Sequence, residues 1–252
     1  PKWQDTSDLL RMGRPKLMVG ITAGNLDSML NKLTAQKKVR RDDQYSPGGQ
    51  AGMRPNRASI VYSNLCRQAF PGVPIVLGGI EASLRRIAHF DYWSEQVRRS
   101  VLLDAKADLL IFGMGERPVW EVARRLKEGE TIGQLTDVRG TAHVRRKGAW
   151  EDIEPSRHVP DGKTVILPSY EEVCSSKTAF AEMSRAFQLE TNPGNARPLL
   201  QAHGSEAVYF NPPAEPLSTG DMDELYDLPF ARVPHHGYTE PIPAYETVKH
   251  SI

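Results

Sequence analysis

Three short apolar runs that end in glycine turns constrain the fold of this chain more than any other feature. They are Leu17–Thr22, Pro74–Leu77 and Leu109–Phe112, and Gly24, Gly78-Gly79 and Gly113-Met114-Gly115 follow them in turn. An amphipathic stretch comes after each turn, which is typical of a buried parallel strand that leads into a helix. Three such units in series predict an α/β fold built on a doubly wound, mostly parallel sheet.

Ligands of open α/β sheets bind outside the carboxyl ends of the strands, where glycine lets a ligand approach the backbone. The turns of this chain are therefore candidate ligand sites, with Asn25, Asp27, Gly78, Gly79, Gly113 and Gly115 as the candidate residues. Tight packing of strand on helix explains the glycines equally well, because no full G-x-G-x-x-G motif is present. Asn25 is also expected to cap the following helix.

Charged and aromatic side chains follow two of these turns. Glu81 and Glu116 each stand at a predicted helix start, where a carboxylate caps the helix or, as an alternative, binds a ligand. The densest cluster comprises Arg85, Arg86, His89, Asp91, Tyr92 and Trp93. Its arginines suit a carboxylate or phosphate. The alternative is an interdomain seam formed by His89, Asp91, Tyr92 and Trp93.

The pattern divides the chain into three parts: an α/β domain over 1–135, an extension over 136–210 and a proline-rich linker over 211–252. We expect helices at Glu81–His89 and Trp93–Leu103, a helix from Asn56, a long helix over Glu171–Leu189, an edge strand at Ala207–Phe210 and a short helix around Met222–Tyr226. Residues 34–57 form a long loop, of the kind that is functional or mobile.

Composition excludes several classes of function. Thirty-two Lys and Arg balance 31 Asp and Glu, so no global field attracts nucleic acid or a membrane. No apolar run approaches the roughly 20 residues that span a bilayer, and a cytoplasmic protein is expected. Cys66 and Cys174 are expected to be ordinary buried or partly buried thiols, and two cysteines cannot hold a [4Fe-4S] cluster. His235, His236 and His250 lack the spacing of a metal site.

Longer motifs carry a family resemblance over essentially the whole chain. They are Gly24–Met29, Tyr45–Gly49, Leu77–Ser94, Val165–Glu171, Pro216–Thr219 and Tyr226–Pro229. Together they resemble the N-terminal region of the YgiQ-type radical SAM proteins. The resemblance implies a linker that leads into a radical SAM barrel, with the C-x-x-x-C-x-x-C motif beyond Ile252 and the first strand of the accessory domain before Pro1.

For the full-length protein the resemblance implies a [4Fe-4S] cluster that cleaves S-adenosylmethionine. It names no catalytic and no metal-binding residue in this chain, which would be inert alone. The accessory region is similar in plan to Rossmann-like, cobalamin-binding-like domains, but it lacks the D-x-H-x-x-G motif of cobalamin ligation, so cobalamin is unsupported. Its expected partners are the barrel of the same polypeptide and an unknown substrate. The alternatives are a stand-alone nucleotide- or phosphate-binding module and an RNA-docking platform.

Overall fold

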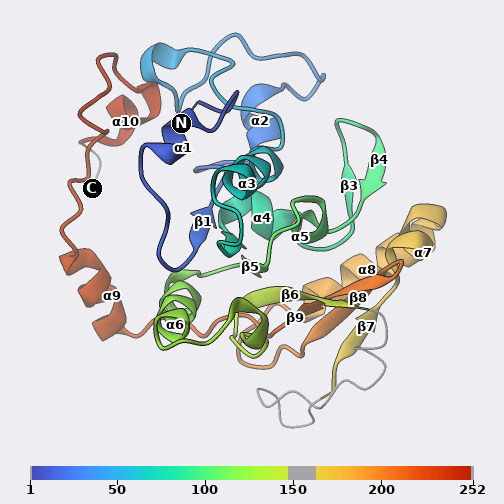
Figure 1. The fold of residues 1–252 in the computed structure, drawn as a ribbon. Coiled ribbons are helices and arrows are strands. Elements are labelled where there is room, and N and C mark those ends of the chain that lie inside the picture. Colours follow the sequence, from blue (N-terminus) through green and yellow to red (C-terminus); the bar gives the residue numbers. More distant parts are fainter. Residues whose placement is uncertain (1, 147–162, 251–252) are drawn as a thin grey trace.

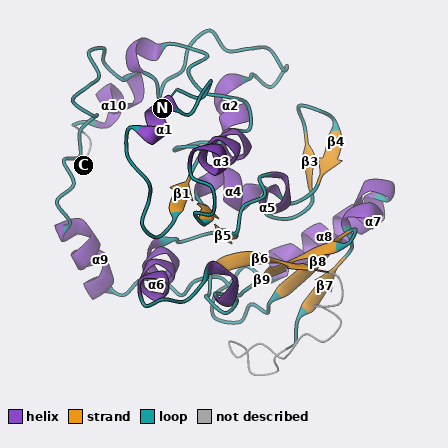
Figure 2. Cartoon of the chain, in the orientation of Figure 1, coloured by secondary structure: helices purple, strands orange, loops and turns teal. Residues whose placement is uncertain are grey.

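A computed structural model of the chain describes residues 2–146 and 163–250. In this part of the chain seven strands form one sheet, in the order β1-β2-β5-β6-β9-β8-β7 (Figures 1 and 2). The strands are β1 (Val19–Ile21), β2 (Ile75–Leu77), β5 (Leu109–Ile111), β6 (Thr141–Arg146), β7 (Val165–Leu167), β8 (Leu199–His203) and β9 (Glu206–Phe210). The predicted α/β class is confirmed.

The first half of the sheet is parallel and is covered on both faces. Strand β2 pairs in parallel with β1 and β5. Its central residue Val76 packs in a different core cluster from its neighbours Ile75 and Leu77, because successive side chains of a strand point to opposite faces. The helices of this half are α1 (Ser7–Leu10), α2 (Ser28–Lys32), α3 (Ala58–Ala69), α4 (Gly79–Leu84), α5 (Val101–Asp104) and α6 (Glu116–Lys127). Val122 of α6 packs in the cluster of Val76, whereas α3, α4 and α5 contribute to that of Ile75, which is the doubly wound arrangement.

The second half of the same sheet comes from the segment after 135. Strand β6 pairs antiparallel with β5 and β9, β9 pairs antiparallel with β8, and β7 is parallel to β8. The prediction that Ala207–Phe210 is an edge strand was wrong, because β9 lies between β6 and β8 and its side chains are buried on both faces. The division at 135 and 210 stays a prediction.

Two predicted helices are interrupted. The stretch Glu171–Leu189 forms α7 (Tyr170–Ser175) and α8 (Lys177–Leu189), since Ser176 has extended backbone and its side chain caps α8. The predicted helix over Trp93–Leu103 is mostly a hairpin, with β3 (His89–Asp91) paired to β4 (Gln96–Arg98) and only α5 remaining helical. Glu95 has a φ of 55° at the hairpin turn, which ends helical geometry there.

Residues beyond β9 form a strap along the side of the molecule (Figure 1). The strap, which we define as residues 211–250, contains α9 (Thr219–Asp227), as expected, and α10 (Pro243–Val248). Its end returns to the predicted long loop, where the N–H of Gly48 donates to the carbonyl oxygen of Pro241 at 2.8 Å and the N–H of Ala244 donates to that of Gln44 at 2.9 Å. The loop itself contains only the short 3-10 turn η1 (Pro47–Gly49). The strap and the long loop therefore meet near the carboxyl end of β1.

Candidate ligand site at the carboxyl edge of the sheet

Glu81 is the centre of the carboxyl edge. Its carboxylate is 1% exposed and accepts hydrogen bonds from the N–H groups of Ser28 at 2.8 Å and Ser59 at 2.9 Å. These donors belong to the first turns of α2 and α3, and Glu81 lies in the first turn of α4. One buried carboxylate thus satisfies donors at two helix starts and lies near the positive ends of three helices. Glu81 therefore caps two neighbouring helices and also stabilises the start of its own helix.

Two predicted caps differ in the structure. Asp27, rather than Asn25, caps α2, and its Oδ1 accepts the N–H groups of Met29 and Leu30. Asn56 does not cap α3, which starts after Arg57 with a left-handed φ of 50° and no side-chain cap. The side chains of Ser28 and Glu81 take over this role, because they accept the first N–H groups of α3. Sequence spacing predicts caps within a helix and misses those supplied across the fold.

Six predicted site residues line one cavity of about 470 Å³ between α2, α4 and the β3–β4 hairpin. These residues are Asp27, Arg85, His89, Asp91, Tyr92 and Trp93. Inside it, the Arg85 guanidinium pairs with the Asp27 carboxylate at 2.8 Å. His89 Nδ1 lies 3.0 Å from the Ile87 carbonyl oxygen, and burial lowers the pKa of the imidazole. Five of the six residues of the cluster named from the sequence therefore share this cavity with Asp27, whereas Arg86 does not line it. The charges of Arg85 and Asp91 are paired within the chain.

Asp91 holds the hairpin to the start of α3. Its buried carboxylate pairs with Arg57 and accepts from Ser94 Oγ at 2.9 Å and from the N–H of Trp93 at 3.3 Å. Burial alone would raise the pKa of Asp91, but the hydrogen bonds from Arg57 and Ser94 and the Arg57 charge outweigh burial and lower it. This ionised carboxylate explains why residues 91–95 turn rather than continue as a helix.

We expect Asp91→Asn to lower the free energy of unfolding at pH 7 and to do so less at pH 3. A carboxyl whose folded-state pKa is depressed stabilises the fold above its unfolded-state value, here 3.8, and that contribution is lost as the pH falls through the folded-state value. Urea unfolding of both proteins at the two pH values measures the difference. A difference that stays constant with pH would contradict the ion-pair interpretation.

Asn25 lies apart from that cluster, in a second cavity of about 730 Å³. This cavity is lined by Thr22–Asn25 after β1, by Tyr45, Arg54 and Tyr62, and by strap residues around Arg232 and Tyr245. The sequence reasoning missed Arg54 and Tyr62. The signal that could have found the region is the long loop over 34–57, which was expected to be functional or mobile and contributes both Tyr45 and Arg54 to the wall.

The remaining candidates line neither of these two cavities. Gly79 has a φ of 79°, and a Cβ there would lie 3.2 Å from the Cβ of Thr22 and closer still to its hydroxyl oxygen. Close packing against Thr22 therefore explains the glycine at this position. Gly78 and Gly115 precede α4 and α6 as N-cap residues, and Gly113 and Glu116 are exposed.

The Arg86 guanidinium lies 4.6 Å from the Phe112 ring and 4.3 Å from the Phe187 ring, and burial lowers its pKa to about 10. Arg86 therefore braces the core.

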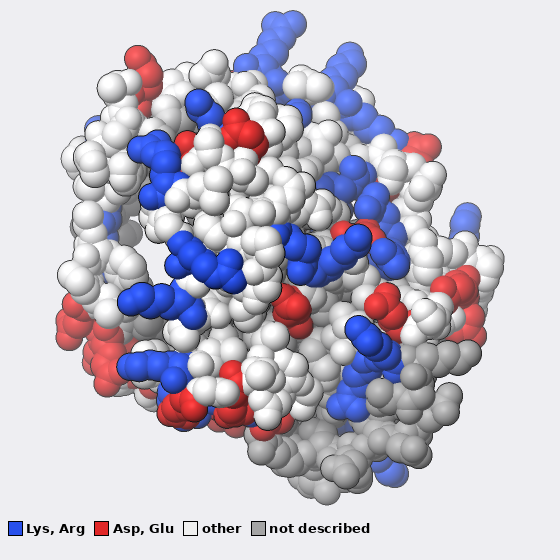
Figure 3. Space-filling model, in the orientation of Figure 1, with Lys and Arg blue, Asp and Glu red and all other residues white. Residues whose placement is uncertain are grey.

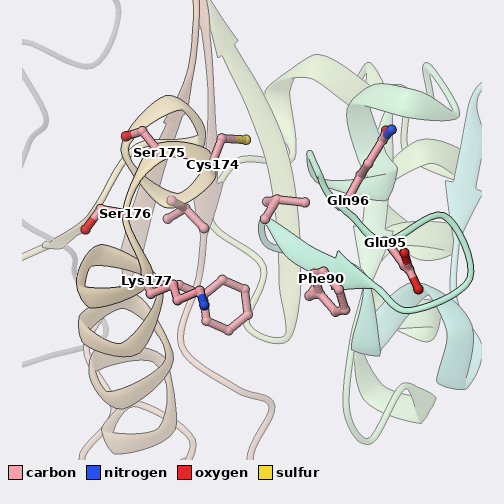
Figure 4. A pocket seen from close by; sticks show the side chains of 10 residues that line it. Phe90, Glu95, Gln96, Cys174, Ser175, Ser176 and Lys177 are labelled. Atoms are coloured by element: carbon pink, nitrogen blue, oxygen red, sulfur yellow. The ribbon is translucent and has the colours of Figure 1, made fainter.

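A third cavity, of about 900 Å³, lies between the β3–β4 hairpin and the break between α7 and α8. Phe90, Glu95 and Gln96 of the hairpin line one side of it, and Cys174 and Lys177 line the other (Figure 4). Cys174 is exposed, contrary to the expectation of two shielded thiols, whereas Cys66 is buried and burial raises its pKa. A lone exposed thiol carries no chemistry by itself.

A family model described as "Radical SAM N-terminal" matches residues 1–251. The chain belongs to this family. Longer curated relatives agree: UPF0313 protein YgiQ of Salmonella typhimurium is 46% identical over all of this chain and 41% of its own length. UPF0313 protein blr7973 of Bradyrhizobium diazoefficiens is 50% identical over all of this chain and 39% of its own length. The chain spans about two fifths of the length of such relatives. No solved structure matches it.

The residues of this Radical SAM N-terminal region do not fit an iron–sulfur cluster. Such clusters are held by several cysteine thiolates, and the only cysteines are Cys66 in α3 and Cys174 in α7. Residues 2–146 and 163–250 contain no group of three or more His, Cys, Asp or Glu side chains placed to hold a metal ion. Nor do these residues include a helix with the length and apolar character needed to cross a membrane.

Proposed function

We propose that this chain is the accessory region of a radical SAM enzyme, in which its carboxyl edge lies against the barrel and helps to bind the substrate. In this proposal the [4Fe-4S] cluster and S-adenosylmethionine belong to the rest of the polypeptide. The observation that carries it is the path of the strap, which leads from β9 back to the carboxyl end of β1 and packs there on η1. The strap and both carboxyl-edge cavities therefore share one edge.

The polar-aromatic cluster around Trp93 supports a covering role. Tyr92 is half exposed and contacts Trp93 edge to face, with ring centroids 5.2 Å apart, at the rim of the 470 Å³ cavity. Flat amphipathic rings at such a rim suit a seam between domains, since they bury large apolar area while keeping polar atoms at the edge. A seam of this kind would exclude water and oxygen from radical intermediates.

The test uses the whole polypeptide that contains this chain, purified and reconstituted with iron and sulfide without oxygen. We expect it to form 5′-deoxyadenosine from S-adenosylmethionine under reduction, and we expect Trp93→Ala to hasten bleaching of the cluster in air. Trp120→Ala is the matched control, because Trp120 is 71% exposed on α6, away from the cavity. Failure to form a cluster would refute the enzyme proposal, and equal bleaching in both variants would refute the covering role.

The RNA-docking alternative has less support than the accessory role. Three arginines that could serve it are engaged within the chain: Arg98 and Arg99 both pair with Asp104, and Arg145 lies over the Tyr209 ring. On the face drawn in Figure 3, basic and acidic side chains are interspersed. Such a surface lacks the single-sign field that nucleic-acid binding draws on.

A further inference from the structure

The 730 Å³ cavity has the form of a small-molecule site. Its floor is the turn Thr22–Asn25 at the carboxyl end of β1, and its roof is the strap. Cavities of about 300–1,000 Å³ lined by apolar and aromatic groups with a few polar ones are typical of such sites. This cavity also lies where open α/β sheets bind ligands.

The charged side chains that line this cavity are all basic. They are Arg54 and Arg232, and no Asp or Glu side chain belongs to its described lining. Arg232 donates to the carbonyl oxygens of Tyr226 and Phe230, so its guanidinium serves the strap itself. Arg54, in contrast, keeps one guanidinium nitrogen without a hydrogen-bond partner among the described residues.

Arg54 is held in place but incompletely satisfied. Its Nη2 donates to the carbonyl oxygen of Tyr45 at 3.2 Å, and its Nε lies 3.6 Å from an Asp43 carboxylate oxygen. Its Nη1 is shielded from solvent and has no hydrogen-bond partner among the described residues. This nitrogen lies 3.1 Å from the position that a Cβ on Gly24 would occupy, which places it beside the cavity floor. An unpaired guanidinium nitrogen there favours an anionic acceptor.

Aromatic side chains from three separate segments enclose the same space. Tyr45 comes from the long loop, Tyr62 from α3 and Tyr245 from α10. The Arg54 guanidinium lies 5.6 Å from the centroid of the Tyr45 ring. Tyrosine rings bind flat ring systems by stacking and offer hydroxyl groups to their polar edges.

We propose that this cavity binds a small anionic compound with a flat ring, whose phosphate or carboxylate group pairs with Arg54. The ring lies among Tyr45, Tyr62 and Tyr245. This binding requires neither cluster nor S-adenosylmethionine, so the proposal stands or falls separately from the proposed enzymatic role.

Isothermal titration calorimetry on the whole polypeptide, without cluster or S-adenosylmethionine, tests the proposal. Three probes are used: adenosine 5′-monophosphate, uridine 5′-monophosphate and 4-hydroxybenzoate. We expect at least one to bind. Comparing the affinity for the two nucleotides with that for 4-hydroxybenzoate distinguishes a phosphate from a carboxylate ligand. Arg54→Gln should weaken binding at least about tenfold, because a charge-assisted hydrogen bond is lost. Arg11→Gln, at a side chain 82% exposed in its pair with Asp8, is the matched control and should bind normally.

Absence of binding by all three probes, or unchanged binding in Arg54→Gln, would overturn the proposal. If Arg54→Gln unfolds at lower temperature than the parent, Tyr245→Ala decides instead. That change removes one ring from the wall on α10 and leaves the Arg54 contacts in place. Unchanged affinity in Tyr245→Ala would then overturn the proposal, and a severalfold loss would support it.

Discussion

Replacing Glu81 with alanine is expected to lower the free energy of unfolding by about 4 kcal/mol. The change leaves the buried N–H groups of Ser28 and Ser59 without an acceptor at the starts of α2 and α3. It also removes a negative charge from the positive ends of these helices. Urea denaturation of the chain, followed by tryptophan fluorescence and circular dichroism, measures the loss.

Glu116 offers a matched control for this change. It follows the third glycine turn and also lies in the first turn of a helix, here α6, but it is exposed. We expect Glu116→Ala to change the free energy of unfolding by no more than about 0.5 kcal/mol. Equal effects of the two alanine variants would show that Glu81 acts only through its own helix and would contradict the cross-helix capping.

Gly79→Ala is expected to lower the free energy of unfolding by about 3 kcal/mol or more. The φ of 79° at this position is strained for any residue with a Cβ, and that Cβ would collide with the side chain of Thr22, the residue that follows β1. Rotation of the Thr22 side chain would relieve part of the contact but would break the hydrogen bond that its hydroxyl oxygen accepts from the N–H of Gly24 at 3.2 Å. Thermal and urea unfolding of the variant give the magnitude.

Gly78→Ala is the matched control, because it changes the same turn without the backbone strain and the collision expected for Gly79→Ala. Gly78 has a φ of −155°, and a Cβ there meets no atom within 4 Å. We expect a loss below about 1 kcal/mol for this neighbour. The double change Thr22→Ala with Gly79→Ala should recover part of the Gly79→Ala loss. Similar losses in the two glycine variants would argue against close packing as the reason for Gly79.

The strand–helix units were predictable because their signals are local. The runs before Gly24, Gly78 and Gly113 each form a short strand, and the apolar run and the turn residues that follow it specify this within a few residues. The hairpin after Asp91 was missed because its cause is a contact with Arg57, far away in the sequence. Trp93, Val97 and Val101 have helical spacing, but that ion pair and the turn at Glu95 prevent a helix there.

The candidate site was predictable only in part. Asp27, Arg85 and Asp91 were each named as candidates from the sequence, and the structure brings them to one cavity, because the turns after the neighbouring strands β1 and β2 lie side by side. The cavity around Arg54 could not be predicted, because its wall combines a loop without regular pattern with a strap from a distant part of the chain. No periodicity joins such segments, and only the folded chain shows them together.

The strap also sets the order in which the molecule can be completed. Gly48 and Pro241 are joined by a backbone hydrogen bond although they lie far apart in the sequence, so closing this contact encloses about three quarters of the chain in one loop. During synthesis the first three strand–helix units leave the ribosome long before the strap does. The strap can therefore cover the cavity only late in synthesis, and the carboxyl edge of a nascent chain stays open until translation has passed α10.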